Sequence, residues 1–346
     1  MTDIASPAAA GDLTAPPAAR RFRFLTDRRL ALLFITPALV VLLFLSVFPL
    51  LWTVFLSLTD YSATRDAPPR WVGLDHYADL LTSAEVLRHA TTTAIFVVGA
   101  ITLQSGLGFA IAYLISRRSR GRGGLTTLFL VPMMLSPVVV GLFWKFMLDA
   151  QFGVVNSVLG SFGLDGREWL TNRGLALTSL IVVDTWQWTP FIMLIALAGM
   201  TAVPRYLYEA ADIDRASEWF KFRHITLPLV RPLLLIAVLF RGIEAFRLFD
   251  LVYVLTGGGP GDSTQTLSFS VYKTAFLGFD TGEAAAYGVL MVVVVMVLAQ
   301  IFVKRLERFG AAGRVEPDRR RGRRPPPAKA LATADGGIDD SREGAR

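Results

Sequence analysis

Four charged residues interrupt an apolar stretch late in the sequence, and their types suit contact with a polar solute. Arg241, Glu244, Arg247 and Asp250 alternate in sign at intervals of three residues. A charge at the middle of a membrane-spanning helix costs about 2.5–3.5 kcal/mol on insertion scales. Such charges therefore compensate one another or face a hydrophilic cavity, where they can hydrogen-bond a solute rich in hydroxyl groups.

On one helix these four charges cannot share a narrow face. Each three-residue step falls about 60° short of a full turn, so the charges sweep about half of the circumference. We predict that Glu244 and its neighbours border a hydrophilic cavity, while a ladder of ion pairs that only stabilises the helices fits the pattern equally well. Asp184 is a second buried acid, and Trp186 could stack on a sugar ring or pack between helices.

No pattern in the sequence is typical of catalysis or metal binding. There is no Cys, and His76, His89 and His224 stand far apart. The sequence contains no HExxH, GxSxG or GxxxxGK[ST] pattern. We therefore expect no catalytic residue, no metal site and no bound cofactor in this chain, and we expect that it does not bind ATP itself.

The composition is that of a membrane protein. Of its 346 residues 53% are hydrophobic and 18% are charged, against about 25% charged residues in ordinary soluble domains. Arg and Lys gather at the two ends, before residue 30 and after Val303. This layout favours a helical bundle with basic ends over a nucleic-acid-binding surface.

Six segments are long and apolar enough to cross the hydrocarbon core, which takes about 20 residues per helix. We predict an all-α polytopic membrane protein with a domain at 30–304 and spans at about 30–58, 92–116, 126–148, 175–200, 229–254 and 284–303. The flanking segments 1–29 and 305–346 are basic and poor in apolar residues, so we predict that they are disordered.

Basic residues alternate between the two sides of this arrangement, and they predict its orientation. Lys and Arg are retained on the cytoplasmic side of a bacterial inner membrane. The connections richest in them carry Arg20, Arg21, Arg23, Arg28 and Arg29, then Arg117, Arg118, Arg120 and Arg122, then Arg205, Arg215, Lys221 and Arg223, and finally Lys304, Arg305 and Arg308. Both termini are therefore predicted to be cytoplasmic.

The connection at 204–228 is longer than a simple turn requires. Its composition predicts a helix up to about Ile213 and another from Ala216 to Arg223, with Pro204 near the start and Pro228 at the end. Apolar residues recur at helical spacing in both parts. The pattern indicates two amphipathic helices that contact a partner protein, or a hairpin that lies on the lipid headgroups.

The motif in this connection resembles the EAA loop of binding-protein-dependent ABC importer permeases. The matching residues are Glu209, Ala210, Ala211, Asp214, Ala216, Phe222 and the run from Ile225 through Leu227 to Pro228. The resemblance implies the type I (MetI-like) permease fold and a coupling helix that docks on a separate ATPase dimer, which binds ATP and Mg²⁺. It also implies a second permease subunit and an extracytoplasmic solute-binding protein.

One residue departs from the motif. The family usually has Gly after the Asp, and this chain has Arg215. A left-handed backbone there would cost a residue other than Gly about 1–2 kcal/mol, so we expect a different turn between the two helices.

Other stretches resemble the carbohydrate-type permeases of the same superfamily. They are found at 71–81, 136–146, 184–191 and 249–267, the last containing TGGGPG. This resemblance implies import of an oligosaccharide, a monosaccharide or glycerol phosphate through a heterodimeric pore. The alternative class is an ion-coupled secondary transporter, although the sequence lacks the internal repeat that is common in such folds.

Overall fold

The structure is a computed structural model that describes the backbone of residues 27–118 and 120–311 and the side chains of 32–118 and 120–305. Within these ranges it is helical apart from loops and one isolated bridge between Thr59 and Trp71. The predicted disordered segments 1–29 and 305–346 fall mostly outside the described residues. Their described parts, 27–29 and 305–311, belong to helices.

In the part of the chain that the structure describes, five helices are long and apolar enough to cross a membrane, and each overlaps one predicted span. They are α1 (Asp27–Leu56), α3 (Ala84–Ser116), α7 (Arg173–Ala202), a continuous helix from Glu218 to Phe246 that ends as α10 (Leu227–Phe246), and α13 (Thr281–Ala311). The long uninterrupted apolar runs thus predict the helices well.

The sixth predicted span, at 126–148, is not a single helix. It consists of α4 (Arg122–Leu130), the 3₁₀ helix η1 (Pro132–Met134) and α5 (Pro137–Met147). Pro132 and Pro137 each lie at the start of a helix, where the missing proline N–H is tolerated. Ser136, before Pro137, is extended, as the residue before a proline usually is, whereas Val131 before Pro132 keeps helical dihedral angles. Gln187 donates to the Leu135 carbonyl at 3.2 Å and so satisfies part of the interrupted backbone.

The predicted span at 229–254 is also shorter than expected at its far end. The helix stops at Phe246, with Arg247 as its C-cap, and α11 (Asp250–Leu255) begins after a break. The four charges of the predicted ladder therefore do not lie on one helix, and that prediction is wrong for Arg247 and Asp250. α11 packs against α5, where Gly141 allows close approach to Val254.

The described residues form two compact units, one within 27–93 and 257–293 and the other within 94–256 and 294–311. In the first unit, the first turn of α13 bonds to the loop after α1, from Gly282 N to Tyr61 O at 2.8 Å. The same unit holds α2 (Asp75–Thr82), α12 (Leu267–Tyr272) and the π-helix η3 (Lys273–Leu277).

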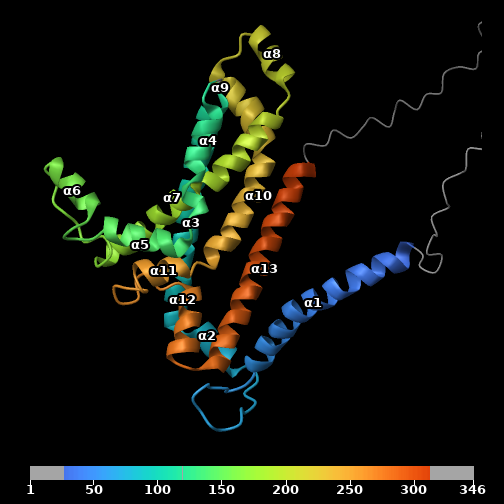
Figure 1. Ribbon diagram of the computed structural model, residues 1–346, viewed down its shortest axis with the longest axis vertical. Coiled ribbons are helices and arrows are strands. Elements are labelled where there is room, and N and C mark those ends of the chain that lie inside the picture. Colours follow the sequence, from blue (N-terminus) through green and yellow to red (C-terminus); the bar gives the residue numbers. More distant parts are fainter. Residues whose placement is uncertain (1–26, 119, 312–346) are drawn as a thin grey trace, which may run out of the picture. The chain divides into compact units, whose positions relative to one another are not determined.

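In the second unit, α3, α7 and α10 lie side by side (Figure 1). Their core contains Ala112, Ile115, Met193, Ala196, Leu197, Met200, Val203 and Val230. α6 (Val154–Ser161), α8 (Arg205–Ile213) and α9 (Glu218–Lys221) complete this unit. Small residues allow the helices to approach closely, since a Cβ on Gly108 of α3 would lie 2.9 Å from Ile192 Cβ and 2.9 Å from Met193 N of α7.

We expect Gly108→Ala to lower the midpoint of thermal unfolding of the purified protein in mild detergent. The added methyl group meets backbone as well as a side chain, and overpacking of this kind costs about 1–3 kcal/mol. Gly106→Ala, on the same helix, is the matched control, because a Cβ on Gly106 would have no neighbour within 4 Å. Equal midpoints for the two variants would contradict the close packing of α3 on α7.

Candidate functional site

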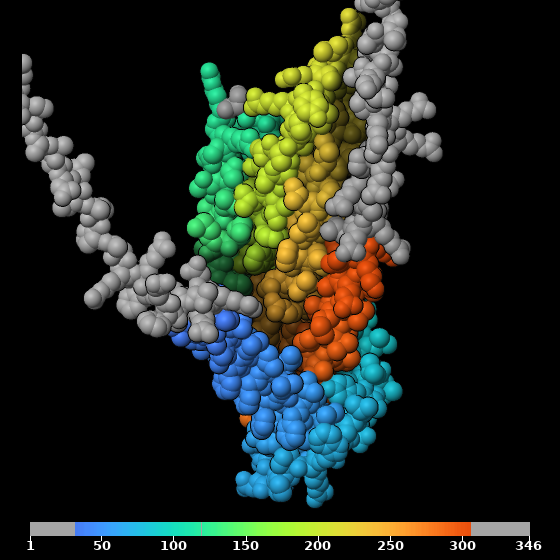
Figure 2. All heavy atoms as spheres, turned by 90° about the vertical axis from the view of Figure 1, so that its right-hand side faces the viewer, coloured from blue at the N-terminus to red at the C-terminus, as the bar shows by residue number. Residues whose placement is uncertain are grey.

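The segment between α7 and α10 begins with α8, which has one face packed inward and one face uncovered. Ala211 is buried, and Leu207 and Tyr208 pack against the core of the second unit. Tyr206 and Ile213 are 65% and 83% exposed and share a helix face with Glu209 and Ala210. Figure 2 shows the yellow-green atoms of this segment at one end of the unit. An exposed face that includes large apolar side chains suits contact with another protein.

The turn after α8 is a Schellman motif with Arg215 in the left-handed conformation. Its φ is 54°, and Asp214 is the helix C-cap. Ala216 N donates to Ala211 O at 2.8 Å and Arg215 N donates to Asp212 O at 3.0 Å, which is the paired bonding of this motif. The prediction of a different turn is therefore wrong, because the two hydrogen bonds hold Arg215 in the backbone conformation that favours Gly.

The second helix of the segment begins at Glu218, later than the predicted Ala216, and it does not end at the predicted Arg223. Ser217 caps α9, with its Oγ accepting from Phe220 N at 3.2 Å. The π-helix η2 (Phe222–Thr226) then continues directly into α10. Leu227 N donates to Phe222 O across this wide turn, and Pro228 lies in the first turn of α10. The wide turn lies directly before Pro228, and the helix continues through this proline to Phe246.

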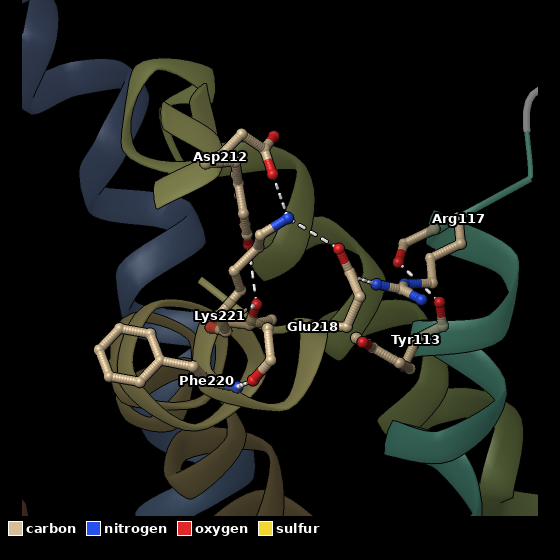
Figure 3. Close-up of polar contacts among 10 residues, drawn as sticks. Tyr113, Arg117, Asp212, Glu218, Phe220 and Lys221 are labelled. Carbon is tan, nitrogen blue, oxygen red and sulfur yellow. Dashed lines mark hydrogen bonds and ion pairs between the residues drawn. The ribbon is translucent and has the colours of Figure 1, made fainter. Parts of the chain in front are cut away.

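Ion pairs tie this segment to the end of α3 (Figure 3). Arg117 pairs with Glu218, and its guanidinium carbon lies 4.9 Å from the centre of the Tyr113 ring. Lys221 pairs with Asp212 and, at 2.7 Å, with Glu218. These contacts border a cavity of about 310 Å³ and connect α3, α9 and α8 in one charged network.

Aromatic packing reinforces the same connection. The ring of Phe222 lies 5.8 Å from that of Phe109, 5.2 Å from that of Tyr113 and 5.2 Å from that of Trp219. Phe222 and Ala211 thus belong to the inward-facing part of the predicted coupling residues. Residues Glu209, Ala210, Asp214, Arg215 and Pro228 are exposed, and Ala216 and Leu227 are intermediate.

A second polar cluster lies buried between α3, α7 and α10. Arg241 pairs with Asp184, and both side chains are at most 2% exposed. Gln104 accepts from Arg241 Nε at 3.0 Å and donates to Asp184 Oδ2 at 2.8 Å. The Arg241 guanidinium also lies 5.1 Å from the ring of Trp188. Asp184 and Arg241 are therefore satisfied by protein groups, and the partner of Arg241 lies on another helix instead of in the predicted ladder.

The remaining predicted pathway residues lie apart from this cluster. Glu244 and Arg247 pair at 2.9 Å, with side chains 53% and 61% exposed. Asp250 is exposed at the start of α11, and Trp186 packs edge-to-face on Trp144 at 5.7 Å. Gln104 was missed by the sequence reasoning, because a single neutral amide in an apolar run does not interrupt the pattern of a span.

Comparison with protein families assigns the chain to a family. Residues 104–309 match the model of the binding-protein-dependent transport system inner membrane component. The chain belongs to this family. With five apolar helices long enough to span a bilayer among its described residues, this permease is a multi-pass membrane protein.

Curated relatives cover most of the permease. It is 38% identical over 282 residues to a probable ABC transporter permease protein, y4oQ, of Sinorhizobium fredii, covering 81% of this chain and 91% of the relative. It is 34% identical over 279 residues to the trehalose/maltose transport system permease protein MalF of Thermococcus litoralis, covering 80% and 94%. It is also 31% identical over 286 residues to the sulfoquinovosyl glycerol transport system permease protein SmoG of Agrobacterium fabrum, covering 82% and 92%.

A solved structure shares the fold of the permease. A chain of a bacterial ABC transporter that imports the acidic polysaccharide alginate matches with a TM-score of 0.71 and 22% identity, covering 82% of this chain and 96% of that chain. The MetI-like fold expected from the sequence is confirmed, whereas the described residues have five long helices and an interrupted third region instead of six continuous spans.

We expect Arg215→Gly to slow hydrogen exchange of the amides in the turn between α8 and α9. Glycine relieves a left-handed conformation that costs another residue about 1–2 kcal/mol. Asp214→Gly is the matched control, because Asp214 has a φ of −74° and gains nothing from glycine there. Faster exchange in the Arg215 variant than in wild type would contradict this assignment.

We expect Asp184→Asn to destabilise the permease strongly, because it leaves the buried Arg241 without its counter-charge. Removing one partner of a buried pair costs about 3–5 kcal/mol. The double variant Asp184→Asn with Arg241→Gln should lose less stability than the sum of the two single variants, as measured by denaturant unfolding. Additive losses would show that the two side chains act independently.

Proposed function

We propose that this permease is one of two membrane-spanning subunits of an ATP-driven importer for a sugar or sugar-like solute. The observation that carries the proposal is the segment 204–228, in which an anchored pair of helices presents an uncovered face that includes Tyr206, Glu209 and Ile213. The resemblance to the EAA loop makes this face the docking surface for a separate ATPase dimer. ATP and Mg²⁺ bind to that partner, and this chain binds no cofactor.

The transport systems to which the relatives belong support the class of solute. Two of the relatives belong to trehalose/maltose and sulfoquinovosyl glycerol transport systems. These solutes carry sugar rings with several hydroxyl groups, which suits a pathway lined by hydrogen-bonding side chains. The proposal therefore extends to sugars and sugar-like solutes as a class.

The partners and orientation follow from the same model of transport. The second permease subunit completes a heterodimeric pore, and an extracytoplasmic solute-binding protein delivers the solute. A related alginate transporter has been solved with its periplasmic protein bound to alginate pentasaccharide. The basic connections that include Arg117 and Arg205 support cytoplasmic termini in the bacterial inner membrane.

We expect the double variant Glu209→Arg with Ala210→Glu to lose its ATPase partner while it keeps the second permease subunit. Both residues lie on the exposed face of α8, so the substitutions change the docking surface without altering the packed face. The measurement is copurification from cells that co-express this chain with its genomic neighbours. Glu168→Arg, another exposed substitution, is the control and should retain both partners.

Two outcomes would overturn the coupling proposal. One is that no ATPase copurifies with the wild-type chain. The other is that solute uptake continues after ATP depletion while the ion gradient is held, which is the behaviour of an ion-coupled secondary transporter.

We expect Glu244→Gln to weaken the apparent affinity for the solute about tenfold. Glu244 is an exposed intramembrane acid, and a hydrogen bond to a charged group contributes about 1.5–3 kcal/mol. Arg247→Gln is the control, because it removes the ion pair but keeps the carboxylate. Unchanged uptake in the Glu244 variant, or equal effects in the two variants, would show that Glu244 acts only through its pair with Arg247.

A further inference from the structure

A cavity of about 510 Å³ lies within the first unit, in residues that neither the coupling segment nor the buried cluster uses. It is bounded by α2, the first turns of α3, α12 with η3, and the first turns of α13 (Figure 1). Its size falls within the range of about 300–1,000 Å³ that is typical of small-molecule sites. The ionisable side chains in its wall are Asp79, Glu85, His89, Lys273, Glu283 and Tyr287.

A chain of hydrogen bonds along one wall fixes the roles of its members. Lys273 Nζ, which can only donate, lies 3.1 Å from Gln265 Oε1. The amide nitrogen of Gln265 therefore donates to Ser270 Oγ at 3.1 Å. Ser270 Oγ donates to Thr266 O at 3.0 Å, so the contact at 2.9 Å with His89 Nδ1 is a bond that His89 donates. The neutral imidazole then presents Nε2 as an acceptor.

Among the residues that the structure describes, that nitrogen has no hydrogen-bond partner. His89 is 2% exposed, and its Nε2 lies 3.9 Å from Glu85 Oε1, which is too far for a hydrogen bond. A buried acceptor left without a donor costs about 1–3 kcal/mol. Since His89 lines the cavity, a ligand that brings an N–H or O–H donor would satisfy it.

The charges of the wall define the ligand further. The carboxylates of Asp79, Glu85 and Glu283 outnumber the single ammonium of Lys273, one of whose protons is already donated to Gln265. Acceptors therefore exceed donors, and the formal charge favours a cation over a neutral or anionic molecule. Among the described residues, no group of three or more His, Asp or Glu side chains is placed to hold a metal ion.

We propose that this cavity binds a small organic cation with a protonated amine, which donates to His89 Nε2 and to the carboxylates of Glu85 and Glu283. The ammonium group supplies several N–H donors and the positive charge that the wall lacks. The site is separate from the surface that couples to the ATPase, and the proposal does not depend on which solute is transported.

Three probes with one sugar ring and different charges test the proposal. Glucosamine, glucose and glucuronate are titrated calorimetrically at pH 6.5 into the full-length permease in lipid nanodiscs. We expect glucosamine to bind about tenfold or more tightly than glucose, and glucuronate not to bind. Absence of glucosamine binding, or binding of glucose or glucuronate with equal affinity, would overturn the proposal.

Variants then locate the site. Glu85→Gln and Glu283→Gln retain side-chain size, and each should weaken glucosamine binding about tenfold. Glu168→Gln, an acid of the other unit, is the matched control and should bind as wild type does. Size-exclusion elution and a circular dichroism spectrum confirm that each variant is folded. Folded Glu85 and Glu283 variants that both bind like wild type, or equal weakening in the control, would place the amine elsewhere and refute the assignment.

Discussion

The ion pair between Arg241 and Asp184 ties the packing of α3, α7 and α10 to one arrangement. Each group is costly to bury alone, and each is satisfied only when α3, α7 and α10 stand in one register that brings Gln104 between them. Apolar side chains can slide past one another with little loss in a bilayer, where lipid is as apolar as leucine. A fully satisfied polar cluster therefore specifies the arrangement, and close approach at Gly108 and Gly199 completes it.

Around this rigid centre the chain departs from regular helix at defined places. Prolines interrupt the chain before α5, and a break separates α11 from α10. The two short helices α5 and α11 nevertheless pack on each other. Within a bilayer, irregular backbone must find hydrogen-bond partners inside the protein, as the Leu135 carbonyl does with Gln187. The π-helix at 222–226 has the opposite effect, since it keeps α9 and α10 continuous through Pro228.

The length of the apolar runs in the sequence predicts the five long helices, because about 20 apolar residues in a row are enough to indicate a membrane-spanning helix. Hydropathy alone does not show the break at Pro132 and Pro137, since both prolines lie in an apolar run that is typical of one span. The charge ladder was predicted to cover half of a helix, and Arg241 is indeed buried while Glu244 is exposed. Which acid meets Arg241 depends on a contact across 57 residues, and local patterns carry no information about it.

The same ion pair has a consequence for the order of events during synthesis. Asp184 leaves the ribosome 57 residues before Arg241, which at about 5–20 residues per second is a delay of roughly 3–11 s. Throughout that interval α7 carries an acid without its counter-charge, at a cost of about 2.5–3.5 kcal/mol if it enters the lipid alone. This cost favours entry of α7 together with α10 over entry of α7 alone.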